Sequence, residues 1–313
     1  MRRLPGSKSF LFALLACSAV SSAAAADHKL LTLVPPGAQE VAGISVTSNQ
    51  SDSRYFVLLP HKDYIDANDF LALSGADSTR VIRELIYVAT TDNTGALNGH
   101  SVLMCGTFDR ERIYKSAVDG GASVIRYRNL SVLVVEPFAR ERGEFNEVRW
   151  LALPESDIVL FGSITAVQQE LDRYLAHSAP DPRLLAPLSR LRHDDQIWTL
   201  LSPPAWDQQI RSALAVINPQ LAAGLRDGDT LRFGIHFGRQ VEFEYAVTAA
   251  TEPVSSEVSD SLMQPIARQG KGLSLLPSPD NNVHGIIKFS MARYNALLAQ
   301  IYPHGQGRNE KIQ

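Results

Sequence analysis

Trp150–Leu175, WLALPESDIVLFGSITAVQQELDRYL, is the stretch from which the fold can be predicted most directly. Two short apolar runs, Trp150–Leu153 and Ile158–Phe161, flank Pro154–Asp157, whose residue types favour a tight turn. Ser163 follows the second run and offers a hydroxyl N-cap for a helix. Apolar residues then recur at helical spacing, at Ile164, Val167, Leu171, Tyr174 and Leu175. The stretch therefore predicts strand, turn, strand and amphipathic helix.

Similar patterns lie on both sides of this stretch and divide the chain into two parts. Strands are expected at 40–46, 86–90 and 101–107, helical material through 80–85, a helix at 109–118 and hairpins at 122–135 and 150–161. The second part is expected to hold strands at 196–201, 231–237, 241–247 and 283–289, helices at 206–225 and 253–268, and a loop at 271–282. Both parts follow the order β-α-β-β-α-β, which is the split βαβ arrangement. We therefore predict an α+β protein of two ferredoxin-like halves with mainly antiparallel sheets, the first extended by the extra hairpins.

Composition shifts place the boundaries of these parts. Pro180, Pro182 and Pro187 lie within ten residues and disfavour helix and central strand alike. The predicted organisation is a signal peptide at 1–26, a first half at 27–178, a Pro-rich junction at 179–195, a second half at 196–303 and a polar tail at 304–313. The repetition concerns the pattern of elements, since the residues of the two halves barely match.

The N-terminus has the layout of an export signal. Three basic residues precede a short apolar run at 10–20, and Ala24–Ala26 matches an A-x-A cleavage site before Asp27. A second interpretation stays open, because Leu14–Cys17 resembles a lipobox in which Cys17 is acylated. The apolar run is too short for a membrane span, and no other stretch is long enough. We expect a periplasmic or secreted protein, with a lipid anchor at Cys17 as the alternative.

Charge and cysteine content narrow the classes of partner. The chain has 30 Lys and Arg against 33 Asp and Glu; removal of residues 1–26 takes away three basic residues and leaves a net charge of −6. A mildly acidic chain without a basic cluster is a poor candidate for binding nucleic acid. Cys105 is then the single cysteine besides Cys17, and its apolar run predicts a buried, inert thiol.

The histidine and acidic residues give weak candidates for chemistry. In the expected hairpin His236 lies opposite Glu242 and diagonal to Glu244, a pair that could act as base and orienter. The competing interpretation is a solvated sheet face with cross-strand charge pairs. The runs 193–195 and 227–229 are interpreted as caps and turns, and the histidines at 61 and 284 have no partner that the sequence identifies. We assign no catalytic or metal-binding residues, leave the binding residues unknown and expect no cofactor.

Two further features are given structural roles. Gly99–Leu103 is the nearest approach to a nucleophile elbow around Ser101, but it lacks the second glycine and leads into a strand. The three tryptophans stand in apolar company and are expected to pack in the core, at Trp150, Trp198 and Trp206.

Three motifs carry a resemblance to a known group. These motifs are VPPGAQEVAGI at Val34–Ile44, FDRERI at Phe108–Ile113 and LPESDIVLFG at Leu153–Gly162. Through them the chain resembles a group of exported proteins that are common in acidobacteria and to which no activity is assigned. The shared positions are strand starts, turns and caps. The resemblance implies an exported bacterial α+β protein and no particular chemistry.

These observations favour a non-enzymatic envelope protein that binds an unknown protein or small ligand between its two halves, with a cleft at the 178–187 junction. One alternative is a hydrolase with an unrecognised site, in which His236, Glu242 and Glu244 are the first suspects. Another is a lipoprotein with a structural role, for which acylation of Cys17 is the discriminating observation.

Overall fold

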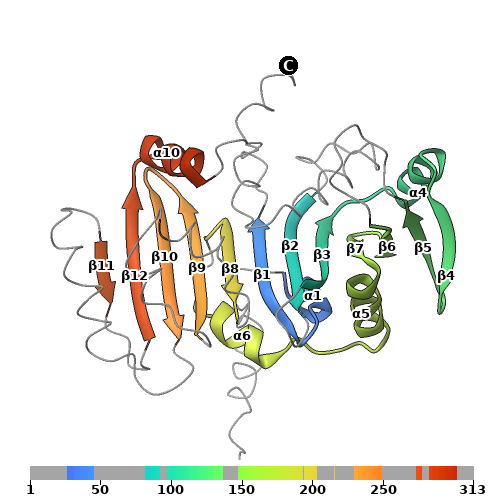
Figure 1. The fold of residues 1–313 in the computed structure, drawn as a ribbon, viewed down its shortest axis with the longest axis horizontal. Coiled ribbons are helices and arrows are strands. Elements are labelled where there is room, and N and C mark those ends of the chain that lie inside the picture. Colours follow the sequence, from blue (N-terminus) through green and yellow to red (C-terminus); the bar gives the residue numbers. More distant parts are fainter. Residues whose placement is uncertain are drawn as a thin grey trace, which may run out of the picture.

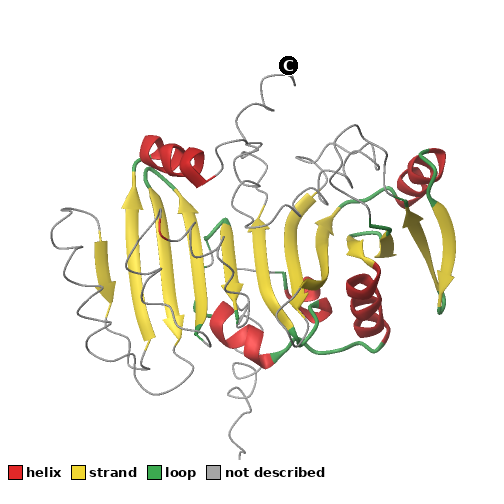
Figure 2. Cartoon of the chain, viewed as in Figure 1, coloured by secondary structure: helices red, strands yellow, loops and turns green. Residues whose placement is uncertain are grey.

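The described strands form one antiparallel sheet. The computed structural model describes residues 27–45, 82–91, 97–136, 147–192, 194–202, 215, 229–248, 273–276 and 282–301. Within these residues twelve strands pair in the order β11-β12-β10-β9-β8-β1-β2-β3-β7-β6-β5-β4 (Figure 1). With a few helices packed on an antiparallel sheet (Figure 2), the predicted α+β class is confirmed.

The elements have the following bounds. The strands are β1 (Ala38–Ser45), β2 (Ile82–Thr91), β3 (Leu97–Gly106), β4 (Ser123–Tyr127), β5 (Leu130–Val135), β6 (Arg149–Glu155), β7 (Ile158–Ser163), β8 (Ile197–Leu201), β9 (Thr230–Phe237), β10 (Val241–Thr248), β11 (Leu273–Leu276) and β12 (Asn282–Phe289). The helices are α1 (His28–Leu33), α4 (Arg110–Asp119), α5 (Ile164–Leu175), α6 (Pro182–Leu188) and α10 (Met291–Ile301).

The β6–β7–α5 segment forms for local reasons. The two strands pair antiparallel, and the Ser163 hydroxyl accepts a hydrogen bond from the backbone N–H of Ala166 at 3.4 Å, which caps α5. Val167 and Leu171 lie on the inner side of α5 and are fully buried in the core. Both the strands and the helix match the elements expected for Trp150–Leu175.

Two other hairpins also form where they were predicted. The turn between β4 and β5 is Arg128-Asn129, and Arg128 adopts a φ of 53°. A positive φ is what the tight two-residue hairpin turns require. In the β9–β10 hairpin Glu242 lies directly opposite His236, as the alternation of apolar residues predicted.

The two halves are joined at the centre of the sheet. β1 pairs antiparallel with β8, so that Gly43 lies opposite Trp198. From this pair the strands β2, β3 and β7 follow on one side and β9, β10 and β12 on the other. The ferredoxin-like halves are not confirmed. In a split βαβ unit the two strands that flank the first helix are separated by a third strand, whereas β1 lies directly beside β2 and pairs antiparallel with it.

Some local predictions were wrong. Ile82–Leu85, expected within helical material, belongs to β2, because its backbone pairs with β1 on one side and β3 on the other while Ile82 and Leu85 are buried in the core. The Pro-rich junction contains α6, in which Pro182 occupies the first turn, where no N–H is needed. β11 lies in the expected 271–282 loop, and α1 was not predicted. The helices expected at 206–225 and 253–268 fall outside the described residues, apart from helical Ala215.

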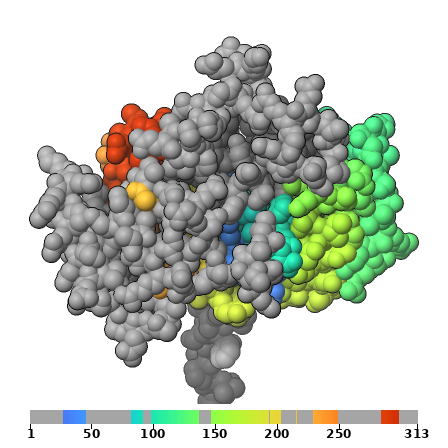
Figure 3. All heavy atoms as spheres, in the orientation of Figure 1, coloured from blue at the N-terminus to red at the C-terminus, as the bar shows by residue number. Residues whose placement is uncertain are grey.

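The sheet has a separate apolar core on each face. On one face α1, α5 and α6 cover a cluster that includes Leu30, Leu171, Leu184 and Trp198. On the other face α4 and α10 contribute Ile113 and Tyr294 to a second cluster. The elements from α4 to α5 make a continuous surface at one end of the molecule (Figure 3). Leu184 of α6 is buried against this face, and the cleft expected at 178–187 stays a prediction.

Candidate functional site

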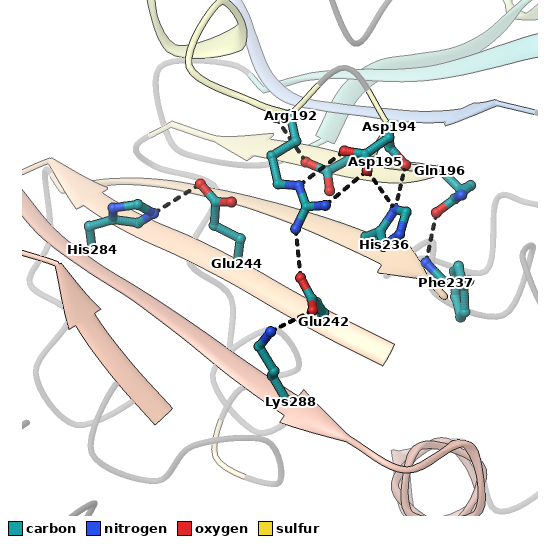
Figure 4. A network of polar contacts seen from close by, with 10 residues as sticks. All are labelled: Arg192, Asp194, Asp195, Gln196, His236, Phe237, Glu242, Glu244, His284 and Lys288. Atoms are coloured by element: carbon teal, nitrogen blue, oxygen red, sulfur yellow. Dashed lines mark hydrogen bonds and ion pairs between the residues drawn. The ribbon is translucent and has the colours of Figure 1, made fainter. Parts of the chain in front are cut away.

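A charged surface lies on the sheet face against which α6 packs, in the C-terminal half of the chain. Direct cross-strand partners share a face of a sheet, and buried Leu200 of β8 pairs with Arg232 of β9. The same face therefore changes from apolar on β8 to charged on the next three strands. We call its ionisable side chains, together with those of the turn before β8, the β9–β12 network. Its members are Arg192, Asp194, Asp195, Arg232, His236, Glu242, Glu244, His284 and Lys288. Figure 4 shows these side chains apart from Arg232.

The centre of the network is buried. Arg232, Glu244 and Asp195 are 7%, 8% and 3% exposed. The Arg232 guanidinium lies 3.9 Å from Glu244 Oε1, and the same oxygen lies 2.9 Å from His284 Nε2. Asp195 Oδ2 accepts a hydrogen bond from the backbone N–H of Arg192 at 3.2 Å. Two carboxylates and one guanidinium are thus removed from water together, which makes their mutual pairing energetically important.

The outer members of the network are half-exposed and pair in a chain. His236 Nδ1 lies 2.8 Å from the carbonyl oxygen of Asp194 and 3.3 Å from its carboxylate. Arg192 bridges Asp194 at 2.8 Å and Glu242 at 2.6 Å, and Lys288 contacts the other oxygen of Glu242 at 2.6 Å. The turn before β8 is in this way tied to β9, β10 and, through Lys288, to β12.

Neighbouring charges and burial shift the proton affinities in opposite directions. The Lys288 ammonium, with Arg192 next, lowers the pKa of Glu242, and Arg192 lowers the pKa of Asp194. Burial, followed by the charge of Glu244, raises the pKa of Asp195 to about 6. At neutral pH Glu242 and Asp194 are therefore ionised and weakly basic. Asp195 loses its proton only as the pH rises through about 6.

The backbone register predicted for His236 and Glu242 is confirmed, but their side chains do not form the expected pair. His236 takes Asp194 as its partner, and Glu242 takes Arg192 and Lys288. Of these contacts, the one between Glu242 and Lys288 joins direct cross-strand partners, as the competing interpretation expected, whereas Asp194 and Arg192 come from the turn before β8. The face is also not fully solvated, because Arg232 and Glu244 are buried. A base-and-orienter pair of His236 and Glu242 is not present.

Sequence reasoning missed the partner of His284. Its Nε2 contacts Glu244, which lies on the neighbouring strand, two residues before Ala246, the direct partner of His284. The alternation of β10 and β12 places both residues on the charged face, but the sequence does not show that these two strands are neighbours. Arg192 was missed for a similar reason, because it precedes β8 and reaches β10 across β9.

The remaining candidate residues lie in the core or outside the described residues. Ser101 is fully buried in β3 and donates a hydrogen bond to Glu170 of α5, so it is not placed as a surface nucleophile. Cys105 is buried, and burial raises the pKa of its thiol to about 11, in keeping with an inert cysteine. Trp150 and Trp198 pack in the core as predicted. The candidates at 61–63, 193, 206 and 227–228 lie outside the described residues.

Among the side chains that the structure describes, no group of three or more His, Cys, Asp or Glu is arranged to hold a metal ion. Likewise, none of the described helices is both long and apolar enough to cross a membrane.

The Asp195 carboxylate depends on a glycine of β9. A Cβ at Gly234 would overlap Asp195 Oδ2 and crowd the rest of the carboxyl group. We expect Gly234→Ala to lower the free energy of unfolding by about 2 kcal/mol, the usual cost of overpacking. Urea denaturation measures this, with Gly37→Ala as the control, because a Cβ at Gly37 meets nothing within 4 Å. Equal stability of the two variants would contradict the close approach.

The comparisons with known proteins bear on the fold. No family model matches the sequence, and neither does any curated protein. Among solved structures the chain is similar to crystal form I of TP0453, with a TM-score of 0.51 and 12% sequence identity. The match covers 88% of this chain and 99% of that one. At this identity the likeness concerns the fold alone, and it extends over nearly the whole of both chains.

Proposed function

We propose that this protein is an exported protein of the bacterial cell envelope that binds a partner and does not catalyse a reaction. The observation that carries the proposal is the pairing of the three residues first suspected of catalysis. His236, Glu242 and Glu244 each contact a different charged neighbour, which is Asp194, Arg192 and Arg232 respectively. Side chains fixed in such pairs hold the strands in register and present a defined pattern of charge, which suits recognition better than proton transfer.

The outer edge of the β9–β12 network is the proposed contact surface. Lys288 and Arg192 are 43% and 35% exposed at their side chains, and the carboxylate of Glu242 lies between them. Charges of both signs at fixed positions discriminate between partners by complementarity, while the buried centre keeps the pattern rigid. A polar partner, such as the charged surface of another envelope protein, fits this surface.

Export is supported by the layout of residues 1–26, and the acidobacterial resemblance agrees with it. The arrangement of strands outward from β1 and β8 is compatible with an internal repeat, β1-β2-β3-β7 beside β8-β9-β10-β12. We propose this repeat as the origin of the two halves, without a ferredoxin-like pairing within them.

A charge reversal at the network tests the binding role. We expect Lys288→Glu to reduce recovery of a cross-linked envelope partner about tenfold, which corresponds to a loss of about 1.4 kcal/mol in binding. Lys115→Glu is the matched control, since Lys115 also pairs with one carboxylate, Asp119 at 2.5 Å, and is 76% exposed. Chemical cross-linking in the native envelope, followed by quantitative mass spectrometry, gives the comparison. Equal recovery with both variants would remove the network as the contact surface.

The hydrolase alternative retains one supporting observation, the approach of the Asp194 carboxylate to His236, which resembles an orienting carboxylate beside a general base. Simultaneous replacement of His236, Glu242 and Glu244 by Ala tests it. Full biological function of that triple variant would exclude catalysis by these residues. The structural lipoprotein alternative is tested by the mass of the mature N-terminus, because it requires an acylated Cys17.

A further inference from the structure

The carboxylate of Glu84 is held at the start of the described chain. Glu84 belongs to β2 and is 8% exposed. Its Oε2 accepts a hydrogen bond from the backbone nitrogen of Asp27 at 2.8 Å. Its Oε1 is buried and has no hydrogen-bond partner among the described residues. One neutral N–H is little compensation for a carboxylate removed from water.

Within the described part of the chain, no charged side chain makes a direct ion pair with Glu84. Arg83 precedes it in β2, but the guanidinium of Arg83 contacts Cys105 Sγ at 3.2 Å. The Asp27 carboxylate accepts hydrogen bonds from the backbone N–H of Lys29 at 2.8 Å and from the Cys105 thiol at 3.3 Å, and its negative charge disfavours a second one nearby. Burial, as the main cause, raises the pKa of Glu84 to about 8.

The nitrogen that contacts Glu84 is also the atom that processing would change. Cleavage after Ala26, the route predicted from the A-x-A pattern, converts the Asp27 amide into a free α-amino group. This group is protonated at neutral pH, with an ordinary pKa of about 8. An ammonium would then stand 2.8 Å from the buried carboxylate without any movement of the chain.

We infer that removal of the signal peptide creates a buried ion pair between the new α-ammonium of Asp27 and the carboxylate of Glu84, and that this pair fastens the mature N-terminus and α1 to β2. The inference rests on the export part of the proposed function. It also separates the two processing routes, because a chain that begins at an acylated Cys17 keeps an amide at Asp27 and gains no counter-ion.

The N-terminus of α1 would be an unfavourable place for the ammonium if no carboxylate were near it. A positive charge at the N-terminus of a helix is unfavourable, because the partial charge of the exposed N–H groups there is positive as well. The Asp27 carboxylate caps this end through Lys29 N, and the Glu84 carboxylate contacts the Asp27 nitrogen. These two negative charges would offset the unfavourable interaction of an ammonium with the helix dipole, and the ammonium would in turn reduce the repulsion between them.

A double-mutant cycle tests the pair. Chains that begin at Asp27 or at Ala25 are released from an N-terminal fusion by a protease that leaves no extra residue, each with and without Glu84→Gln. We expect the unfolding equilibrium constant of the Asp27 chain to be about tenfold lower than that of the Ala25 chain, and the difference to fall below about threefold with Glu84→Gln. Equal constants for the two unsubstituted chains would overturn the inference.

Glu155→Gln is the matched control. Glu155 also accepts a contact from α1, from Lys29 Nζ at 2.8 Å, but its side chain is 38% exposed. The substitution should leave the tenfold difference between the two chain starts unchanged. If it abolishes the difference as Glu84→Gln does, the effect belongs to α1 in general and the assigned pair is wrong.

Two measurements remain decisive if Glu84→Gln does not fold. The α-amino pKa of the Asp27 chain, followed by NMR after isotope-labelled reductive methylation, should exceed the ordinary value of about 8 by one unit or more. An ordinary value would overturn the pair. The mature N-terminus of native protein should be Asp27; a different start would overturn the role of processing, while the Lys288→Glu experiment would still decide the binding surface separately.

Discussion

Replacing Glu170 with Gln is expected to stabilise the protein by roughly 4 kcal/mol at pH 9 and to change its stability little at pH 4, as judged from a pKa difference of three to four units. Glu170 is fully buried in α5, and the hydroxyl of Ser101 donates to one of its oxygens. Burial raises the pKa of Glu170 to about 8 from a usual value of 4.5. The side chain is therefore largely protonated in the folded protein at neutral pH.

The sign of the pH effect follows from the raised pKa. Between pH 4.5 and 8 the folded chain keeps a proton at Glu170 that the unfolded chain releases. The stabilisation is complete below pH 4.5 and is lost as the pH rises through about 8. Gln keeps the shape and the acceptor for Ser101 but has no charge to bury, so its contribution to stability does not change with pH.

Urea denaturation at pH 5, 7 and 9 measures this effect. Asp172→Asn is the control, since Asp172 lies on the same helix but is 44% exposed and pairs with Arg128. We expect the difference between Glu170→Gln and the unsubstituted chain to grow with pH, and that of the control to stay small. A difference that is constant over this range would show that Glu170 titrates normally.

The second large effect is expected at the join between the two halves. A Cβ at Gly43 would overlap the indole ring of Trp198, which is fully buried. β1 is bonded on both edges, to β2 and β8, so the strand cannot move away from the ring. We expect Gly43→Ala to lower the free energy of unfolding by about 3 kcal/mol, the upper end of the usual cost of overpacking. Denaturation with urea or heat gives the value.

A compensating substitution separates this clash from a backbone effect. Trp198→Phe removes the part of the ring that overlaps, at a cost of about 2 kcal/mol for the cavity that remains. In the presence of Trp198→Phe, Gly43→Ala should cost at least 1 kcal/mol less than it does alone, since residues in contact are coupled by about 0.5–3 kcal/mol. Strict additivity of the two substitutions would mean that the ring does not limit this position.

Predictions succeeded where structure depends on neighbours in the chain. The β6–β7–α5 segment is set by a short turn, the Ser163 cap and the spacing of Val167 and Leu171. The β9–β10 hairpin is set by alternating apolar residues about a three-residue turn, and this also fixed Glu242 opposite His236. Each signal lies within about 25 residues, where periodicity and capping are informative.

Predictions failed where distant strands choose their partners. The pairing of β1 with β8 joins Gly43 to Trp198, more than 150 residues apart, and no local pattern specifies it. Ile82–Leu85 was predicted to be helical but forms a strand, because its backbone pairs with both β1 and β3. The side-chain pairs of the β9–β12 network were predicted least well. The partners of Glu242 and Glu244 lie on elements that become neighbours only in the folded sheet.

The central place of β1 has a consequence for synthesis and export. Its partner on one side, β8, begins more than 150 residues later in the chain. A chain that emerges N-terminus first therefore presents an open, apolar strand edge until β8 arrives, which is the condition under which strands of different molecules associate. A fragment that ends at 178 would keep that edge permanently open. We thus expect it to aggregate, and we expect the full chain to depend on a holding chaperone until its C-terminal half has been delivered.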